Sequence, residues 1–399
     1  MKKILLTLAL VGACFSGITA QTKIPETINL LPNPSRRTEI ILPKVNGLNI
    51  YKADLHIHTI YSDAQLTPEQ RIKEAWFDGL DIVSITDHLE VRNNEPKMLE
   101  YLKGYTDGVA KKAVNHRIHV KPADGEGIKA DLNLPTKLAQ KAAEAYGDAL
   151  LVIPGCEITR RPKTIGHYNV LFATDNNAIY DPDPMQSLRN AREQGALITQ
   201  NHPGWARKSC DITEFEQKAF DAGLIDGVEI MNNISFYPKA MQRCIDKNLY
   251  MVACTDIHAQ TNMYSSNGVF RTMTFVFAKE NTAKAVRKAL EKRMTLAYCA
   301  GHIAGDAALL QDFFKASVSC KLLAYGKKGR ATHALTNNTS IGYKLRIGRK
   351  EMVLPPFQTI TITLNKGKDG KDKDVTFQVA NMWEVGYKNP TIIYKSSAK

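Results

Sequence analysis

The feature that most constrains the fold is an alternation of short apolar segments with amphipathic ones, which continues from about residue 49 to about residue 314. The apolar segments are typical of buried strands: LDIVSITDH, LLVIPGCEI, GHYNVLFA, ALITQNHP, GVEIMNN, LYMVACTDIH and TMTFVFA, in chain order. Strands that alternate with helices form parallel sheets, because helical crossovers connect neighbouring strands. Seven or eight such units favour closure, so the sequence predicts an α/β fold with a barrel.

Amphipathic helical segments separate several of these strands. The first has Thr67 as its N-cap, Pro68 at the first helical position, Gln70 completing a capping box and Gly79 as the stop. Further helices are predicted over residues 184–194, 214–222, 238–248 and 282–294. An insertion at about 90–148 is predicted to be partly helical, and it offers a place for substrate contacts.

The pattern changes near residue 315. Residues 315–399 contain short alternating strands separated by turn-rich pieces, including the loop NKGKDGKDKD, and are predicted to form a small antiparallel β domain. Packing against an edge of the barrel is the expected role of this domain, and contacts in a homo-oligomer are the alternative. Residues 21–48 are an N-terminal extension that precedes the barrel.

The first twenty residues, MKKILLTLALVGACFSGITA, have two lysines, a short apolar stretch and a small residue before Gln21, which is typical of a secretory signal peptide. Cleavage after Ala20 would accompany export to the periplasm. In an alternative interpretation, LVGAC resembles a lipoprotein cleavage site, and a lipid on Cys14 would anchor the protein. No later segment reaches the roughly 20 apolar residues of a membrane-spanning helix.

The chain has a formal net charge of +13 at neutral pH, and part of it belongs to the lysines of the predicted signal peptide. A positive balance suits anionic ligands. The sequence has no dense Lys/Arg block with interleaved aromatic residues, so nucleic acid is not expected as the main partner.

Metal-binding side chains gather at the ends of the predicted strands. Residues two apart in a strand point the same way, so His56 and His58 project together, as do Asp256 and His258. Five more lie at strand ends: Asp87, His88, Glu157, His167 and His202. The C-terminal ends of barrel strands meet at one face, where so many polar groups would be costly to bury without ions. His167 begins its strand, so either the strand boundaries shift or the fourth strand runs differently.

The motifs DLHIHTIYSD, ITDH, PGCEI, GHYNVLF, NHPGW and TDIH occur in this order, and together they resemble the motif set of the PHP family, the polymerase and histidinol phosphatase superfamily of metal-dependent phosphoesterases. The resemblance covers roughly residues 50–300 and implies a distorted, TIM-like (β/α)7 barrel with three divalent metal ions. The implied ligands are His56, His58, Glu157 and Asp256 for the first metal, Glu157, His167 and His202 for the second, and Asp63, His88 and His258 for the third.

The expected mechanism is attack on phosphorus by a hydroxide held between the first two metals, while the third metal binds a non-bridging oxygen. Metal ions suit this reaction because they lower the pKa of water and shield the phosphoryl charge. Imidazole and carboxylate ligands suit Mn, Zn or Fe without selecting among them. Glu157 and Asp256 are therefore expected to act in catalysis, and Asp87 either orients a ligand histidine or donates a proton to the leaving group.

Substrate positioning needs cations beyond the metals, and the candidates are Arg160, Arg161 and Arg271, with Lys208 as a further one. Two aromatic residues could contact the organic arm of the ester, Trp205 and Tyr264. The layout of signal peptide, barrel and β domain also resembles exported PHP phosphodiesterases of bacteria. The expected function is hydrolysis of small organic phosphodiesters. The alternatives are a phosphomonoesterase on the same site, an amide or lactone hydrolase, and a non-catalytic metal-binding PHP module.

Overall fold

The computed structural model describes residues 36–92, 94, 131–367 and 371–396. The predicted signal peptide, including Cys14, and much of the insertion at 90–148 lie outside these residues. From Arg37 onward the described residues form one compact unit. Within them, no helix is both long enough and apolar enough to cross a bilayer.

Seven strands form the wall of a barrel: β1 (Asn49–Ile57), β2 (Ile82–Ile85), β3 (Leu151–Thr159), β4 (His167–Leu171), β5 (Leu197–Gln200), β6 (Gly227–Asn232) and β8 (Tyr250–Cys254). Strands β1 to β6 pair in chain order, and β8 pairs with β6. The ring closes between β8 and β1 without a regular ladder. At this seam Ile57 forms an isolated parallel bridge with Ile257, and the Asp256 N–H donates to the His56 carbonyl at 2.9 Å. The predicted α/β barrel is confirmed, with an irregular seam.

Strand β4 runs antiparallel to both of its neighbours, β3 and β5. The connection from β3 spans only residues 160–166, whereas a parallel crossover needs a dozen or more residues. The chain therefore turns back, and His167 pairs with Thr159 at the end of β3. Of the two alternatives left open for His167, the structure supports the second, since the fourth strand runs differently from the parallel strands. Because β4 is reversed, its first residue, His167, lies at the same end of the barrel as the last residues of the parallel strands.

The sheet continues beyond the barrel wall, and it contains twelve strands in all within the described residues. The added strands are β7 (Ser235–Phe236), β9 (Met273–Ala278), β10 (Thr295–Cys299), β11 (His302–Gly305) and β18 (Met382–Trp383). Strand β9 pairs antiparallel with the first half of β1, where Asn49 lies opposite Ala278. The segment TMTFVFA is therefore a strand, as predicted, but it extends the sheet and does not continue the parallel series.

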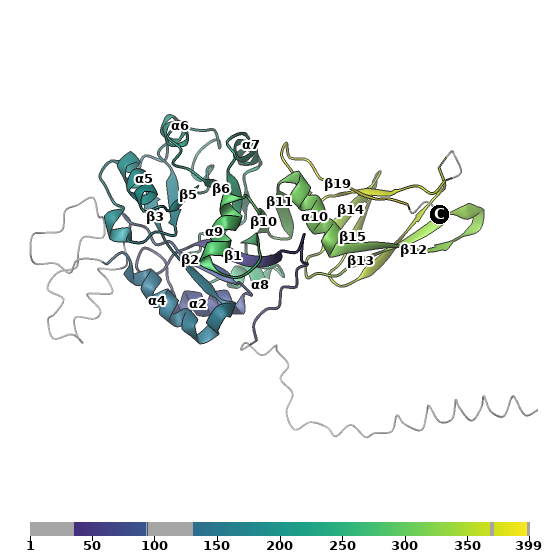
Figure 1. The fold of residues 1–399 in the computed structure, drawn as a ribbon, viewed down its shortest axis with the longest axis horizontal. Helices are drawn as coiled ribbons and strands as arrows, with labels where there is room; N and C mark the ends of the chain where they lie inside the picture. Colours follow the sequence, from purple (N-terminus) through teal and green to yellow (C-terminus); the bar gives the residue numbers. More distant parts are fainter. Residues whose placement is uncertain (1–35, 93, 95–130, 368–370, 397–399) are drawn as a thin grey trace, which may run out of the picture. The chain divides into compact units, whose positions relative to one another are not determined.

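Five helices cover the barrel where the sequence predicted them: α2 (Pro68–Phe77), α5 (Pro184–Glu193), α6 (Glu214–Asp221), α7 (Pro238–Asp246) and α9 (Ala283–Glu291). Helix α4 (Leu134–Ala143) lies in the insertion that was predicted to be partly helical, and the short α8 (Asn262–Ser266) and two 3-10 turns, η2 (Glu144–Ala149) and η3 (Asn176–Ala178), were not predicted. Figure 1 shows α2 and α4 side by side. The predicted capping box of α2 is present, because Thr67 Oγ1 accepts from the Gln70 N–H and Gln70 Oε1 from the Thr67 N–H. Gly79 follows α2 with φ +87°, which only glycine adopts readily.

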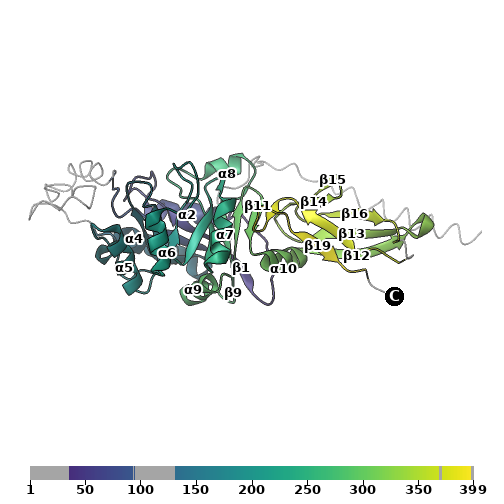
Figure 2. The same ribbon diagram turned by 90° about the horizontal axis from the view of Figure 1, so that it is seen from above.

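The C-terminal part is a pair of antiparallel sheets, as predicted. Strands β12 (Val318–Tyr325), β13 (Ala331–Asn337) and β16 (Thr359–Leu364) form one sheet, and β14 (Tyr343–Ile347), β15 (Lys350–Leu354), β17 (Val375–Val379) and β19 (Thr391–Tyr394) form the other; η4 (Lys327–Gly329) is a turn. Helix α10 (Ala307–Ser317) leads into these sheets, and both views place it beside them (Figures 1 and 2). Phe314 of α10 packs on Tyr343 and Phe377, with ring centroids 4.8 and 5.7 Å apart. Strand β18 joins this part to the main sheet by pairing with β11.

Candidate metal centre

The structure brings all nine predicted ligand side chains together at one end of the barrel. Within the described residues they form three groups able to hold an ion: His56, His58 and Glu157; Glu157, His167 and His202; and His58, Asp63, His88 and His258. Asp256 adjoins the first group, since its Oδ1 lies 3.2 Å from His56 Nε2 and 3.1 Å from His58 Nε2. The grouping differs from the expected one in that His58 borders two groups.

Glu157 at the end of β3 is the residue that links the groups. Its Oε1 lies 3.6 Å from His56 Nε2, 3.4 Å from His167 Nδ1 and 3.7 Å from His202 Nε2. Its Oε2 accepts from Thr159 Oγ1 at 2.8 Å and also contacts His88 Nδ1. The carboxylate is fully buried among these rings. One carboxylate therefore faces histidines from β1, β4 and the segment after β5, which is the arrangement of a ligand shared by two ions.

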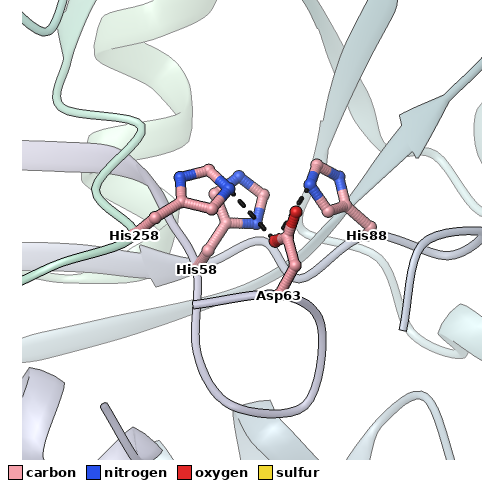
Figure 3. A group of neighbouring side chains, drawn as sticks. All are labelled: His58, Asp63, His88 and His258. Carbon is pink, nitrogen blue, oxygen red and sulfur yellow. Dashed lines mark ion pairs between the residues drawn. The ribbon is translucent and has the colours of Figure 1, made fainter. Parts of the chain in front are cut away.

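The third group surrounds Asp63, which lies on the turn after β1 (Figure 3). Its Oδ1 is 3.1 Å from His258 Nε2 and 3.3 Å from His88 Nε2. The ring of His58 lies beside both histidines, with centroids 4.2 Å from His88 and 4.4 Å from His258. Figure 3 shows the Asp63 carboxylate directed between the two histidines that it contacts.

The two pairs of ligands spaced two residues apart reach the site by different backbone geometry. His56 lies within β1 and His58 directly follows the last residue of this strand, Ile57, so the expected alternation of strand side chains extends to both. Asp256 and His258 lie beyond Cys254, the last residue of β8, and Asp256 adopts a left-handed conformation with φ 53°. His202 also has a positive φ, of 23°. Such conformations cost energy in non-glycine residues and concentrate at functional sites.

Glu229 on β6 is a site residue that the sequence reasoning missed. Its Oε1 lies 2.7 Å from His56 Nδ1, and its Oε2 accepts from the His202 N–H and from Asn232 Nδ2, both at 2.9 Å. It is fully buried and orients one ligand from each of two metal groups. The available signal was a lone carboxylate inside the apolar strand GVEIMN, since such a group is rarely buried without partners.

Asp87 is satisfied by the turn that carries Asp63. It accepts from the Thr59 N–H at 2.7 Å, from Thr59 Oγ1 at 2.5 Å and from Ser62 Oγ at 2.6 Å. Ser62 Oγ in turn lies 3.5 Å from His58 Nδ1. Asp87 does not line the cavity at the site. Of the two expected roles, these contacts support orientation of a ligand through Ser62, and they correct the expectation of proton donation to a leaving group.

Burial and mutual contact set the charges of the cluster. Burial alone would lower the pKa of His56, but Asp256, Glu229 and Glu157 overcome it and raise the pKa to about 10. Burial, reinforced by the neighbouring His88, lowers the pKa of His58 to about 3. Burial would raise the pKa of Glu157, yet the surrounding histidines hold it well below its usual range. Without metal, the site therefore pairs ionised carboxylates with a protonated His56, whereas His58 is neutral.

Metal binding is expected to release protons at neutral pH. Carboxylates outweigh burial and raise the pKa of His56 to about 10 and the pKa values of His202 and His258 above the ordinary one, so these rings hold their protons to higher pH in the metal-free protein. A metal ion binds only a neutral imidazole, so affinity should increase as pH rises from about 6 to about 9. Calorimetric titration with Mn²⁺ in two buffers of different ionisation enthalpy measures the proton release. Equal apparent enthalpies in both buffers would contradict the prediction.

A cavity of about 410 Å³ opens beside the three groups. Beyond the ligands, its lining includes Arg160, Arg161, Lys163, Trp205, the segment Asn232–Ser235 and Tyr237. Arg160 lines it as predicted, but its guanidinium is held by Glu90 Oε1 at 2.9 Å and by the Asp181 carbonyl at 2.6 Å. Arg161 and Trp205 border the cavity as expected from the sequence. Lys208 is exposed and does not line it.

Arg271 does not reach the cavity. It is 2% exposed, and its NH2 group lies 2.7 Å from Asp54 Oδ2 while its NH1 group lies 3.2 Å from Asp78 Oδ2. The expectation that it binds substrate is therefore corrected: the guanidinium is a buried partner of two carboxylates. Tyr264 is likewise buried and outside the cavity lining.

Comparison with known proteins agrees with the fold and the site. A closed α/β barrel with three histidine–carboxylate groups at one end defines a metal-binding barrel protein. A family model described as the PHP domain matches residues 54–205. A crystal structure of a two-domain protein containing a predicted PHP-like metal-dependent phosphoesterase, from Bacteroides vulgatus, has 31% sequence identity and a TM-score of 0.76, over 90% of this chain and 98% of that one. The chain belongs to the PHP domain family.

Two further solved structures share less with this chain. A putative metal-dependent phosphoesterase from Bifidobacterium adolescentis has 15% identity and a TM-score of 0.36, over 52% of this chain and 88% of that one. A lesion-specific endonuclease from Pyrococcus furiosus has 17% identity and a TM-score of 0.38, over 65% of this chain and 59% of that one. No curated protein matches the chain.

Proposed function

We propose that this PHP protein is an exported, metal-dependent phosphoesterase that hydrolyses small organic phosphodiesters. The observation that carries the proposal is Glu157, whose two carboxylate oxygens face ligands of neighbouring metal groups beside one cavity. The cavity, at about 410 Å³, is of the size that encloses a small molecule. Small esters are therefore proposed as substrates, and nucleic acid is not proposed as the main partner.

The donor atoms of the site fit divalent Mn, Zn or Fe. Every donor in the three groups is an imidazole nitrogen or a carboxylate oxygen, and no described cysteine belongs to them. We propose three ions, one for each group. When bound, such ions lower the pKa of water and shield the charge of a phosphoryl group.

The chain's own residues orient these ligands and hold the carboxylates ionised. Glu229 fixes the ring of His56 and the backbone of His202, while Asn201 Nδ2 donates to Glu157 Oε1 at 2.8 Å. Thr159 Oγ1 lies 2.6 Å from His88 Nδ1, so that the Nε2 atom of this ring faces Asp63. These contacts preorganise the site before substrate arrives, which saves reorganisation during the reaction.

Comparison of two chromogenic esters tests the diesterase proposal. Bis(p-nitrophenyl) phosphate is expected to be turned over faster than p-nitrophenyl phosphate by the same metal-loaded preparation. The reverse order would assign a phosphomonoesterase instead. Turnover of neither ester, together with hydrolysis of an amide or lactone panel, would reject phosphoester chemistry. Unchanged rates in His202→Ala would favour a contaminating enzyme and a non-catalytic module.

Removal of metal is expected to abolish activity reversibly. Dialysis against a chelator should lower kcat/KM by at least about 100-fold, since the ions supply both water activation and charge shielding. Addition of Mn²⁺ or Zn²⁺ should restore activity, and elemental analysis should then find more than one ion per chain. Full activity in a preparation shown to contain no metal would contradict the proposal.

Export is tested by cell fractionation and by mass spectrometry of the mature N-terminus. A mature chain in the periplasmic fraction that begins at Gln21 would support the proposal. A lipid attached to Cys14 would instead establish the anchored alternative, and a full-length chain in the cytoplasmic fraction would contradict export.

A further inference from the structure

Two basic residues on the β3–β4 connection, Arg161 and Lys163, form what we call the cationic rim of the cavity. Both side chains are exposed and line the cavity beside the metal groups. No carboxylate of the described residues lies within ion-pair distance of either one. Their neighbour Arg160 differs, because Glu90 neutralises it at 2.9 Å. The rim therefore presents two charges that the described part of the protein leaves without a counter-ion.

The cavity itself offers no spare negative charge to this rim. Its lining includes three carboxylates, Asp63, Glu157 and Asp256. All three belong to the metal centre, where each contacts two or more histidines. Another part of the lining, Asn232–Ser235 with Tyr237, carries no charged side chain. An anion bound in the cavity would therefore have two unpaired cations beside it and no unpaired carboxylate of the lining, which favours anion binding.

Trp205 contacts both Lys163 of the rim and two ligand histidines. The Lys163 ammonium lies 4.9 Å from the centre of the indole ring, and that ring lies 5.3 Å from His167 and 5.4 Å from His202. The indole is 50% exposed, so part of its surface remains available to a ligand. A phosphoryl group at the metals would be placed by the ligand set, whereas Lys163 is placed to contact the organic arm.

We propose that the natural substrate is a phosphate ester whose organic arm carries a second anionic group, which binds Arg161 and Lys163. This inference rests on the proposed function, and it specifies that the organic arm of the substrate is negatively charged. The arm passes over Trp205, and its anionic end, a carboxylate or a phosphate, meets the rim. Arginine presents a planar pair of donors to such an oxyanion, and lysine adds a point charge.

Three synthetic diesters with the same p-nitrophenolate leaving group test the inference. Their second arms are 3-carbamoylpropyl, 3-carboxypropyl and 3-phosphonopropyl, so they differ at the terminal group and not in leaving-group chemistry. The wild-type protein is expected to prefer a charged arm over the carbamoyl arm by about 10- to 100-fold in kcat/KM, the range expected of charge-assisted hydrogen bonds. The larger of the two preferences identifies carboxylate or phosphate as the anion.

Removal of the rim charges should abolish this preference. In the double variant Arg161→Gln, Lys163→Gln the ratio of kcat/KM values should fall to about 1. Lys163→Arg should keep most of the preference, because it keeps the positive charge. The variants should fold normally, because these exposed side chains support no core packing. The matched control Lys208→Gln removes a nearby charge outside the cavity and should leave the ratio unchanged. Raising NaCl should reduce the wild-type preference by screening.

The outcomes separate the two proposals. Turnover of all three diesters without a charge preference, or a preference that survives in the double variant, would overturn the inference and leave the phosphodiesterase proposal standing. Failure of the metal-loaded protein to hydrolyse any of the three would overturn the phosphodiesterase proposal, and the inference would fall with it.

Discussion

Replacement of Glu157 by glutamine is expected to lower kcat/KM by about 1,000-fold or more, the upper end of what loss of one preorganised charged group costs. The carboxylate contacts His56, His167 and His202 through Oε1, and Glu157→Gln would remove the anion that these rings share. The new amide would also bring a donor against Asn201 or Thr159, both of which already donate to this side chain. Elemental analysis should find at least one ion fewer per chain than in the wild type.

A surface variant controls for nonspecific effects of the same substitution. Glu214→Gln on α6 changes an exposed carboxylate whose only ion pair among the described residues is with Lys218. It should alter neither metal content nor kcat/KM, because exposed pairs contribute little. Retention of full metal content and activity by Glu157→Gln would show that the residue is not a shared ligand. The far-ultraviolet circular dichroism of both variants should match that of the wild type.

Elements governed by local sequence were predicted well. The capping box of α2 and the helices near residues 184, 214, 238 and 282 depend on neighbouring residues, and all were found where expected. The nine ligand side chains were also gathered together in the structure, since most of them follow apolar strands whose ends meet on a barrel. The short edge strands β7 and β18 were missed because two residues carry no periodicity.

Features that depend on distant partners could not be predicted from one sequence. The neutralisation of Arg271 requires Asp54, which lies 217 residues away, and nothing near Arg271 indicates it. The role of Glu229 depends on His56, 173 residues away. The direction of β4 could have been inferred, because the connection from β3 is too short for a crossover helix. The antiparallel pairing of β9 with β1 had no comparable local signal.

The barrel seam provides the second large expected effect, through Arg71 on α2. Its guanidinium is fully buried and donates to three carbonyls, those of His58 at 2.8 Å, Ala259 at 2.7 Å and Ile257 at 3.1 Å. The first belongs to the segment after β1 and the other two to the segment after β8. Because an isolated bridge and a few hydrogen bonds join these strands without a regular ladder, Arg71 acts as a clamp across the seam that carries His58 and His258.

Arg71→Met is therefore expected to lower the free energy of unfolding by about 3 to 5 kcal/mol, the cost of removing one partner from a buried charged network. Three carbonyls and Glu74 would lose a donor, and His58 and His258 would lose their fixed spacing around Asp63. Urea unfolding measures the stability, and titration with Mn²⁺ should show at least one weakened site.

Arg71→Lys should recover part of the stability but not the three-way geometry, since an ammonium lacks the planar fork. Arg287→Met, which breaks a surface pair with Glu291, should cost under about 1 kcal/mol. If Arg71→Met were as mild as this control, the seam would hold without the clamp.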